Sequence, residues 1–422
     1  MHLEDKKKSL FFFWSIFFVY MMVYMTKSCF SAAMASIVDA GVLSKSQTGL
    51  ITAVFYLAYT PLQIVGGVMA DRFKPARIIE IGLLGAAIAN GIIFFNQNYI
   101  LMLITWGLNA VAQFGVWPGV FKILSSQLVP DQRKQAVFFI SFSSTLGLMV
   151  AYIIAALVRR WESNFAIASA VLFALTIFFH IVAKRMEPHM VPDTVPRGVH
   201  SDEPIKLVKH NLPTKKLLLL GGVIFVVVYI LLRAMVENGV KTLSSTMLME
   251  SYTQISPSIG NLLNTLIILS GVVGICFVRY VLSRFIKDEI VSTTLLLLVS
   301  LPLTLVLRYV GQGSAWIMVL SMCIIVAALN GTHYLSLAYN MRFTRYGLNA
   351  TVAGIVNASA SFGLVLQNYG FPLLAETTSW NFVANTWAIM LGISALALIV
   401  FLPRWKRFIA MENAEEIVEE TV

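Results

Sequence analysis

Residues 223–240 read VIFVVVYILLRAMVENGV, an apolar stretch with one arginine, Arg233, well inside it. A run of about 20 apolar residues is the length that an α-helix needs to cross the roughly 30 Å hydrocarbon core of a bilayer. An arginine at that depth costs about 2.5–3.5 kcal/mol on insertion scales, so it normally faces the protein interior or a water-filled cavity. The stretch therefore predicts a membrane-spanning helix with one polar face.

The composition of the chain extends this prediction beyond one helix. Of 422 residues, 58% are hydrophobic and 12% are charged, whereas a soluble domain has about 25% charged residues. Apolar runs of the necessary length recur along the chain. The sequence thus predicts an all-α polytopic membrane protein with twelve transmembrane helices, at residues 10–40, 47–70, 78–95, 100–129, 135–158, 164–186, 216–250, 257–280, 289–310, 315–342, 347–375 and 381–403.

The distribution of lysine and arginine predicts the orientation of these helices. If the N-terminus is cytoplasmic, most of the 31 basic residues fall in cytoplasmic segments. Five would lie on the outer side, namely Lys45, Arg159, Arg160, Lys241 and Arg308. Because cytoplasmic loops are enriched in basic residues, we expect both termini to be cytoplasmic and the protein to lie in the cytoplasmic (inner or plasma) membrane. The same distribution accounts for the net charge of +10 without a nucleic-acid partner.

A long polar segment divides the predicted helices into two groups of six. Residues 187–215 contain prolines and charges without a sustained apolar period, as expected of a linker. Lys27 in the first helix of one group and Arg233 in the first helix of the other stand at similar positions along their helices. We therefore predict two pseudo-symmetric six-helix bundles, at 1–186 and 216–422, joined by a cytoplasmic linker.

The sequence carries no sign of an enzyme or a metalloprotein. It has no HExxH or GxSxG motif, and its three cysteines, Cys29, Cys276 and Cys323, lack the spacing of a disulfide framework. We expect no catalytic residues, no cofactor, no metal and no disulfide.

The loop after the second predicted helix, GGVMADRFKPAR at residues 66–77, resembles the signature of the major facilitator superfamily, G-x-x-x-D-R-x-G-R-R in its commonest form. The sequence differs from this signature at Lys74 and Pro75 and matches it at Gly67, Asp71, Arg72 and Arg77. The resemblance implies the major facilitator fold across the whole chain. It also implies that the four matching residues form a gating loop, which closes the cytoplasmic side in one access state.

Four stretches resemble the organophosphate:phosphate antiporters within that superfamily: VYMTKSCFSAAM at 23–34, FYLAYTPLQIVGG at 55–67, GVWPGVFKILSSQLVP at 115–130 and VYILLRAM at 228–235. Those antiporters carry one cation in the first helix and one in the seventh, and the two cations hold the substrate phosphate. The resemblance therefore implies that Lys27 and Arg233 bind an anion. Lys27 stands where arginine is usual, and because lysine lacks the planar fork of arginine, a carboxylate also suits the pair.

Other polar residues are candidates for the same substrate site. In the major facilitator fold the first, fourth, seventh and tenth helices line the central cavity, which adds Lys122 and His333 to the two cations. Secondary candidates are Tyr24, Tyr59, Gln63 and Tyr229. As alternatives, Lys122 could snorkel to the membrane interface, His333 could be an interior histidine, and the tyrosines could serve packing.

Glu237 is a candidate for ion coupling. It follows Arg233 by four residues, so the two side chains share one face of the helix and can pair. In one interpretation this pair is purely structural. In the other, protonation of Glu237 frees Arg233 for the substrate.

These features predict a secondary active transporter that moves a small organic anion, a phosphorylated or carboxylated metabolite, by alternating access. One alternative is a proton-coupled symporter of hexuronates or other organic acids, like the related anion:cation symporters. Another is a transporter-like ligand sensor, which would need an extra cytoplasmic domain, and the tail MENAEEIVEETV is too short for one. The coupling ion would be a proton or inorganic phosphate, and we expect a monomer in the lipid bilayer.

Overall fold

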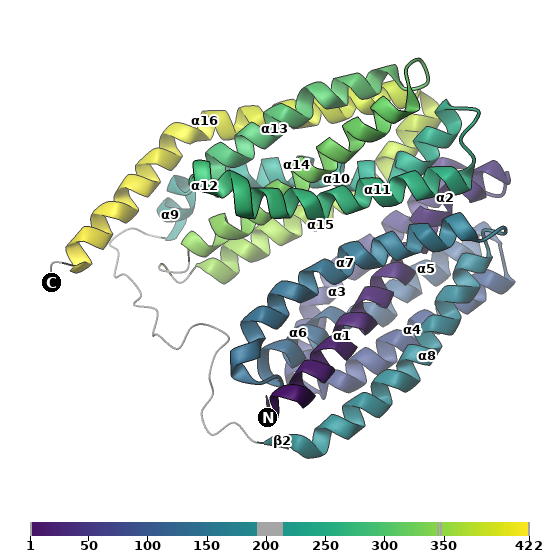
Figure 1. Cartoon of the computed structure of the whole chain (residues 1–422), viewed down its shortest axis with the longest axis horizontal. Helices are drawn as coiled ribbons and strands as arrows, with labels where there is room; N and C mark the ends of the chain where they lie inside the picture. The colour runs from purple at the N-terminus through teal and green to yellow at the C-terminus, as the bar shows by residue number, and fades with distance from the viewer. Residues whose placement is uncertain (1, 192–213, 344–345, 347, 421–422) are drawn as a thin grey trace. The chain divides into compact units, whose positions relative to one another are not determined.

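The computed structural model describes residues 2–191, 214–343, 346 and 348–420 (Figure 1). Within these ranges every long element is an α-helix, and the two strands, β1 (His2–Leu3) and β2 (Met190–Val191), have two residues each. The strands pair antiparallel, with Leu3 opposite Met190. The structure confirms the all-α fold class. Most of the predicted linker, residues 192–213, lies outside the described residues.

Helices α1 to α8 precede the linker. Their bounds are α1 (Lys6–Lys27), α2 (Cys29–Asp39), α3 (Lys45–Arg72), α4 (Pro75–Phe95), α5 (Tyr99–Gln113), α6 (Val116–Ser126), α7 (Pro130–Leu157) and α8 (Ser163–Met186), followed by the short 3₁₀ turn η1 (Glu187–His189).

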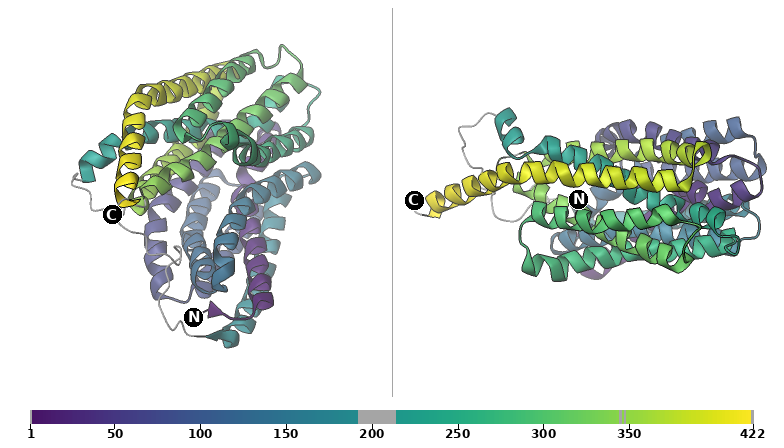
Figure 2. Two further views of the ribbon diagram at one scale, coloured as in Figure 1. Left: turned by 60° about the vertical axis from the view of Figure 1, so that its left-hand side comes forward. Right: turned by 90° about the horizontal axis from the view of Figure 1, so that it is seen from above.

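Helices α9 to α16 follow the linker. Their bounds are α9 (Thr214–Leu220), α10 (Val223–Ser251), α11 (Pro257–Phe277), α12 (Ser283–Phe285), α13 (Glu289–Val306), α14 (Ala315–Arg342), α15 (Asn349–Thr377) and α16 (Trp380–Glu420), with a π-helical turn η2 (Val278–Leu282) and a 3₁₀ turn η3 (Leu307–Tyr309). The last helix, α16, contains Pro403 and is bent in the left view of Figure 2. A proline inside a helix removes one backbone hydrogen bond and kinks the helix.

The long helices account for the twelve predicted spans. Among the described residues, nine helical segments are long and apolar enough to cross a membrane. Three further helices, α3, α7 and α15, have 28, 28 and 29 residues and occupy the second, fifth and eleventh predicted spans.

The chain forms two compact units. The first comprises Met1–Glu203, Thr242–Leu269 and Asn368–Thr377, and the second comprises Pro204–Lys241, Ser270–Gln367 and Thr378–Val422. Helices α10, α11 and α15 therefore contribute to both units. The predicted division into bundles at 1–186 and 216–422 stays a prediction.

In the first unit, α1 packs along α7, and α4 packs along α8 (Figure 1). Gly147 permits the first of these contacts, because a Cβ at this position would lie 2.1 Å from the carbonyl oxygen of Met21 and 2.7 Å from Cβ of Tyr24. The outer faces of α4 and α8 expose large apolar side chains, such as Ile81 at 68% and Phe173 at 55%. Contiguous exposed apolar surface of this kind marks a membrane-facing or partner-facing surface, and here it suits the hydrocarbon of the bilayer.

In the second unit, α13 packs along both α14 and α16. A close crossing of α11 and α14 is permitted by glycine, because a Cβ at Gly274 would lie 1.9 Å from the backbone oxygen of Ala327. Gly271 in turn leaves room for the side chain of Asn330, whose Nδ2 would lie 2.6 Å from an added Cβ. This crossing places Ala327 and Asn330, in the middle of α14, against α11.

Candidate functional site

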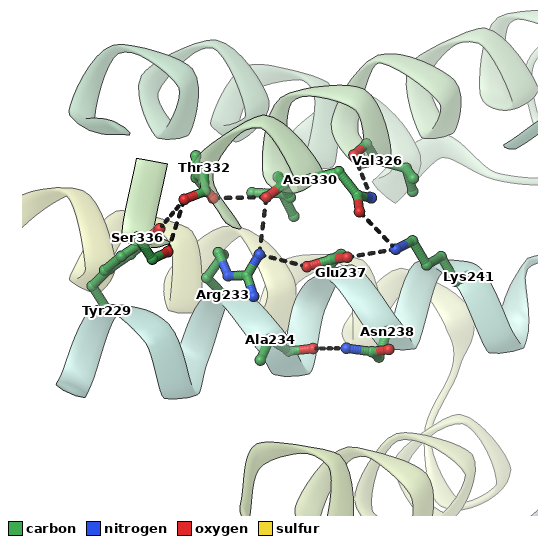
Figure 3. Close-up of polar contacts among 11 residues, drawn as sticks. Tyr229, Arg233, Ala234, Glu237, Asn238, Lys241, Val326, Asn330, Thr332 and Ser336 are labelled. Carbon is green, nitrogen blue, oxygen red and sulfur yellow. Dashed lines mark hydrogen bonds and ion pairs between the residues drawn. The ribbon is translucent and has the colours of Figure 1, made fainter. Parts of the chain in front are cut away.

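Three charged side chains form a row along α10 in the second unit (Figure 3). Arg233, Glu237 and Lys241 are spaced four residues apart, which places them on one face of the helix. Each is buried, with exposed fractions of 3%, 6% and 7%. Buried charges need partners of opposite sign or hydrogen bonds, so the contacts of this row define what it can do.

Glu237 is shared between the two cations. Its Oε2 lies 2.6 Å from Nη1 of Arg233, and its Oε1 lies 2.5 Å from Nζ of Lys241. The predicted pairing of Arg233 with Glu237 is confirmed. Lys241, which the charge distribution placed on the outer side, is buried within α10, and its side of the membrane stays a prediction.

Helix α14 supplies the remaining partners of the row. Nη1 of Arg233 donates to the backbone oxygen of Leu329 at 2.9 Å, and Nζ of Lys241 donates to Oδ1 of Asn330 at 3.2 Å (Figure 3). The Asn330 amide is itself held, since its Nδ2 donates to the backbone oxygen of Val326 at 3.1 Å. Both cations are therefore fixed by groups on a neighbouring helix.

One donor of the Arg233 guanidinium is not engaged. Among the described residues, its buried Nε has no hydrogen-bond partner. A buried donor without a partner is destabilising by about 1–3 kcal/mol. Two parallel N–H groups of a guanidinium match the two oxygens of a carboxylate or phosphate. The edge that includes Nε is thus chemically suited to an oxyanion.

A second buried cation, Lys27, lies at the end of α1 in the first unit and is 7% exposed. Its Nζ donates to the hydroxyl of Tyr59 at 3.0 Å and lies 4.1 Å from the centroid of that ring. The rings of Tyr24 and Phe55 lie farther away, at 5.2 and 5.9 Å. Within the part of the chain that the structure describes, no carboxylate forms an ion pair with Lys27. Aromatic faces stabilise its charge but leave it without a counterion.

Comparison with known proteins identifies the family. A model of the Major Facilitator Superfamily matches residues 16–366. The chain belongs to this superfamily. Its resemblance to the superfamily signature, noted in residues 66–77, is thereby confirmed.

Several relatives within the superfamily are similar to the chain. The membrane sensor protein UhpC of Escherichia coli K12 is 22% identical over 411 residues, which cover 92% of this chain and 91% of the relative. A probable hexose phosphate transport protein of Chlamydia pneumoniae is 29% identical over 121 residues, which cover 29% of this chain and only 27% of the relative.

Solved structures support the same fold. The inward-facing, unoccupied structure of a bacterial homolog of the human lysosomal transporter Spinster aligns with a TM-score of 0.69 and 16% identity, covering 97% of this chain and 98% of that one. The family and this structural neighbour are transporters rather than enzymes. The protein is accordingly a multi-pass membrane protein of the major facilitator fold.

The other predicted site residues lie at several places in the superfamily fold. Tyr229 is buried one turn before Arg233 and donates to the backbone oxygen of Thr332 at 3.2 Å. His333 is exposed on α14 and close enough to Glu237 to interact electrostatically. Lys122 is half-buried on α6, and Tyr24 is half-buried on α1.

The signature residues are only partly described. Arg72 is exposed at the end of α3, and Arg77 is exposed in the first turn of α4. The side chains of Asp71 and Gln63 lie outside the described part of the structure, as do the surroundings of Gly67. The gating role of this loop stays a prediction.

One residue of the charged row, Lys241, and its partner Asn330 were missed in the sequence. Lys241 follows Glu237 by four residues, the same spacing that indicated the pairing of Glu237 with Arg233, so this signal was available. Asn330 had no such signal, because its role depends on the crossing of α11 and α14. Within the described ranges, no group of three or more histidine, cysteine, aspartate or glutamate side chains is placed to hold a metal ion.

Proposed function

We propose that this protein is a secondary active transporter that moves a small organic anion, a phosphorylated or carboxylated metabolite, by alternating access. The observation that carries the proposal is the buried Nε of Arg233, which lacks a partner among the described residues and marks one edge of the guanidinium. An anion bound along that edge accepts two charge-assisted hydrogen bonds.

The charge balance around Arg233 supports this proposal. Five carboxylates occur in residues 214–378. Four of them lie at or near helix ends and bond elsewhere: Glu250 with Lys45, Asp288 with Trp405, Glu289 with Arg342 and Glu376 with the backbone of Ser46. Among the described residues, Glu237 is the carboxylate that pairs with Arg233, and Lys241 already neutralises it. The row therefore has one positive charge more than its carboxylate balances, and a bound anion would compensate it.

Lys27 provides a second cation of the same kind. It is buried, and its Nζ contacts one hydroxyl and three aromatic rings. A lysine in such surroundings gains from an anionic ligand, because burial without a counterion disfavours its charge. We propose that Lys27, like Arg233, binds the substrate anion.

The chemistry of the relatives narrows the class of anion. The Chlamydia pneumoniae relative is named for hexose phosphate transport. A phosphate monoester presents several oxygens to a guanidinium edge, and a hexuronate presents a carboxylate with two. A proton-coupled symporter of hexuronates or other organic acids is the alternative transport function.

The remaining candidates have roles within this proposal. Lys122, His333, Tyr24, Tyr59, Gln63 and Tyr229 would contribute to the substrate site, and Glu237 would couple transport to a proton. Antiport against inorganic phosphate is the other coupling mode. Gly67, Asp71, Arg72 and Arg77 would form the cytoplasmic gate, with both termini on the same side of the cytoplasmic membrane.

A ligand sensor is the second candidate function. One observation favours it: the relative that aligns over 92% of this chain is named a membrane sensor protein. A sensor and a transporter can share one anion site, and they differ in whether the ligand crosses the membrane.

Uptake into proteoliposomes tests the proposal. Purified protein is reconstituted, and uptake of radiolabelled glucose 6-phosphate and glucuronate is measured with inorganic phosphate or a proton gradient as the driving species. We expect saturable uptake by the wild type, none by Arg233→Leu, and normal uptake by Arg308→Leu, which removes an exposed arginine outside the row.

The same experiment separates the candidates. Wild-type uptake by Arg233→Leu would contradict an anion site at Arg233. Ligand binding by the wild-type protein without uptake under any driving species would favour the sensor.

A further inference from the structure

The carboxylate of Glu237 lies between the two cations of the charged row, Arg233 and Lys241. Glu237 is divided between two partners, with Oε2 on Arg233 and Oε1 on Lys241 (Figure 3). Each cation also has its own anchor on α14, Leu329 for Arg233 and Asn330 for Lys241. Neither cation therefore depends on Glu237 for its position.

Anion binding at Arg233 creates a problem for Glu237. An incoming anion and the Glu237 carboxylate both pair with the same guanidinium, and the two negative charges repel each other. If Arg233 were the sole partner of Glu237, binding would leave a buried carboxylate without a counterion, which is strongly unfavourable. Glu237 would then act as an internal competitor of the substrate.

The surroundings of Glu237 contain few other charges. On α10 it faces Arg233 and Lys241, and from α14 it interacts with His333. Helix α11 contains no charged residue, and α15 contains only Glu376, in its last turn. The balance between Arg233 and Lys241 therefore decides where the Glu237 charge is compensated.

We infer that Lys241 is a positioning residue that keeps Glu237 neutralised while Arg233 binds the substrate anion. Asn330 holds the ammonium of Lys241 in place, and Lys241 in turn holds the carboxylate. This inference rests on the proposed anion site at Arg233. It assigns Lys241 no contact with the substrate.

The inference makes a specific claim about pairs of variants. In Lys241→Met, Glu237 has Arg233 as its remaining fixed cation and competes with the ligand, so affinity falls. In Lys241→Met combined with Glu237→Gln, the competitor is removed, so affinity returns. Lys241→Arg keeps a cation beside Glu237 and binds nearly as the wild type does.

Binding of glucose 6-phosphate and glucuronate to purified protein, measured by titration calorimetry, tests this claim. For the ligand that binds the wild type, we expect the dissociation constant to rise about tenfold or more in Lys241→Met and to return within about threefold in the double variant, the first change equalling about 1.4 kcal/mol. Lys45→Met is the matched control, because it breaks another lysine–glutamate pair, with Glu250 at 2.7 Å. Thermal unfolding without ligand checks that every variant is folded.

Each of the other outcomes would overturn either the inference alone or the inference together with the proposed function. Wild-type affinity in Lys241→Met, with no binding by Arg233→Leu, would overturn the inference and leave the proposed function intact. Weak binding that Glu237→Gln does not restore would mean that Lys241 contacts the ligand or only supports the fold, and would also overturn the inference. Wild-type affinity in Arg233→Leu, or no binding of either ligand by the wild type, would overturn the proposed function and the inference together.

Discussion

Arg233 donates a hydrogen bond from Nη1 to the backbone oxygen of Leu329, 2.9 Å away on the neighbouring helix α14. A backbone acceptor is present whatever side chain stands at position 329, so this contact fixes the guanidinium independently of Glu237. With Nη1 held on one side, the plane of the guanidinium is set, and the buried Nε, which has no partner among the described residues, is the donor left for a ligand. This orientation supports the following expectation.

Arg233→Ala should abolish transport with little loss of folded protein, and Arg233→Lys should impair it strongly. An ammonium cannot bond Leu329 and Glu237 and also present two parallel donors to an anion. Each lost charge-assisted hydrogen bond contributes about 1.5–3 kcal/mol, so the dissociation constant should rise roughly tenfold to a hundredfold. Uptake into proteoliposomes measures the effect, with Arg308→Lys as the control.

The double variant Arg233→Leu with Glu237→Leu tests the opposite interpretation, in which Arg233 merely neutralises Glu237. On that interpretation the double variant transports normally. Uptake at the wild-type rate would refute the substrate-binding role of Arg233.

Tyr59→Phe should weaken substrate binding moderately, because it removes the hydrogen bond that orients Nζ of Lys27 at 3.0 Å. A single hydrogen bond of this kind contributes about 0.5–1.5 kcal/mol, so we expect KM to rise about two- to tenfold. Lys27→Met should abolish transport, and Lys27→Arg should be tolerated better than Arg233→Lys. The control is Tyr56→Phe on the same helix, and an equal effect of both tyrosine variants would contradict the role of Tyr59.

Gly274→Ala should destabilise the second unit and reduce activity with it. The new Cβ would lie 1.9 Å from the backbone oxygen of Ala327, and overpacking of this kind costs about 1–3 kcal/mol or more. Gly354→Ala is the matched control, since nothing lies within 4 Å of its added Cβ. Thermal unfolding in detergent should show a lower midpoint for Gly274→Ala alone; equal midpoints would show that α11 and α14 can separate at no cost.

Asp288→Ala should destabilise the start of α13. The Asp288 carboxylate accepts from the backbone N–H groups of Ile290 and Val291 at 2.9 and 3.0 Å and from Nε1 of Trp405 at 3.0 Å. Loss of an N-cap costs about 0.5–2 kcal/mol. Asp131→Ala in the first turn of α7, where the carboxylate is exposed, should have little effect on the same unfolding midpoint.

The sequence predicted the features that depend on local spacing. The interval of four residues between Arg233 and Glu237 predicted their pairing, and the apolar runs predicted the spans that the helices occupy. The same interval of four residues joins Glu237 to Lys241, but counting basic residues by loop does not reveal this pairing. Periodicity along α10 is the better guide to it.

The partners from α14 could not be predicted in this way. Leu329 contributes through its backbone oxygen, which has no sequence signature. Asn330 reaches Lys241 because α11 and α14 cross closely at Gly271 and Gly274. A glycine in an apolar helix can serve a close helix crossing, a bend or a turn. Only the packing of two distant segments shows which of these applies.

Glu237 is the sole carboxylate among the described residues of the charged row. The codon for residue 237 therefore determines whether the row carries one or two net positive charges. A single base change converts a glutamate codon into a glutamine codon, and at position 237 it would leave both cations of the row uncompensated. Such a change would shift the preference of the site toward ligands of higher negative charge without any other change in the charged row. The shared carboxylate makes the valence of the cargo an easily evolved property.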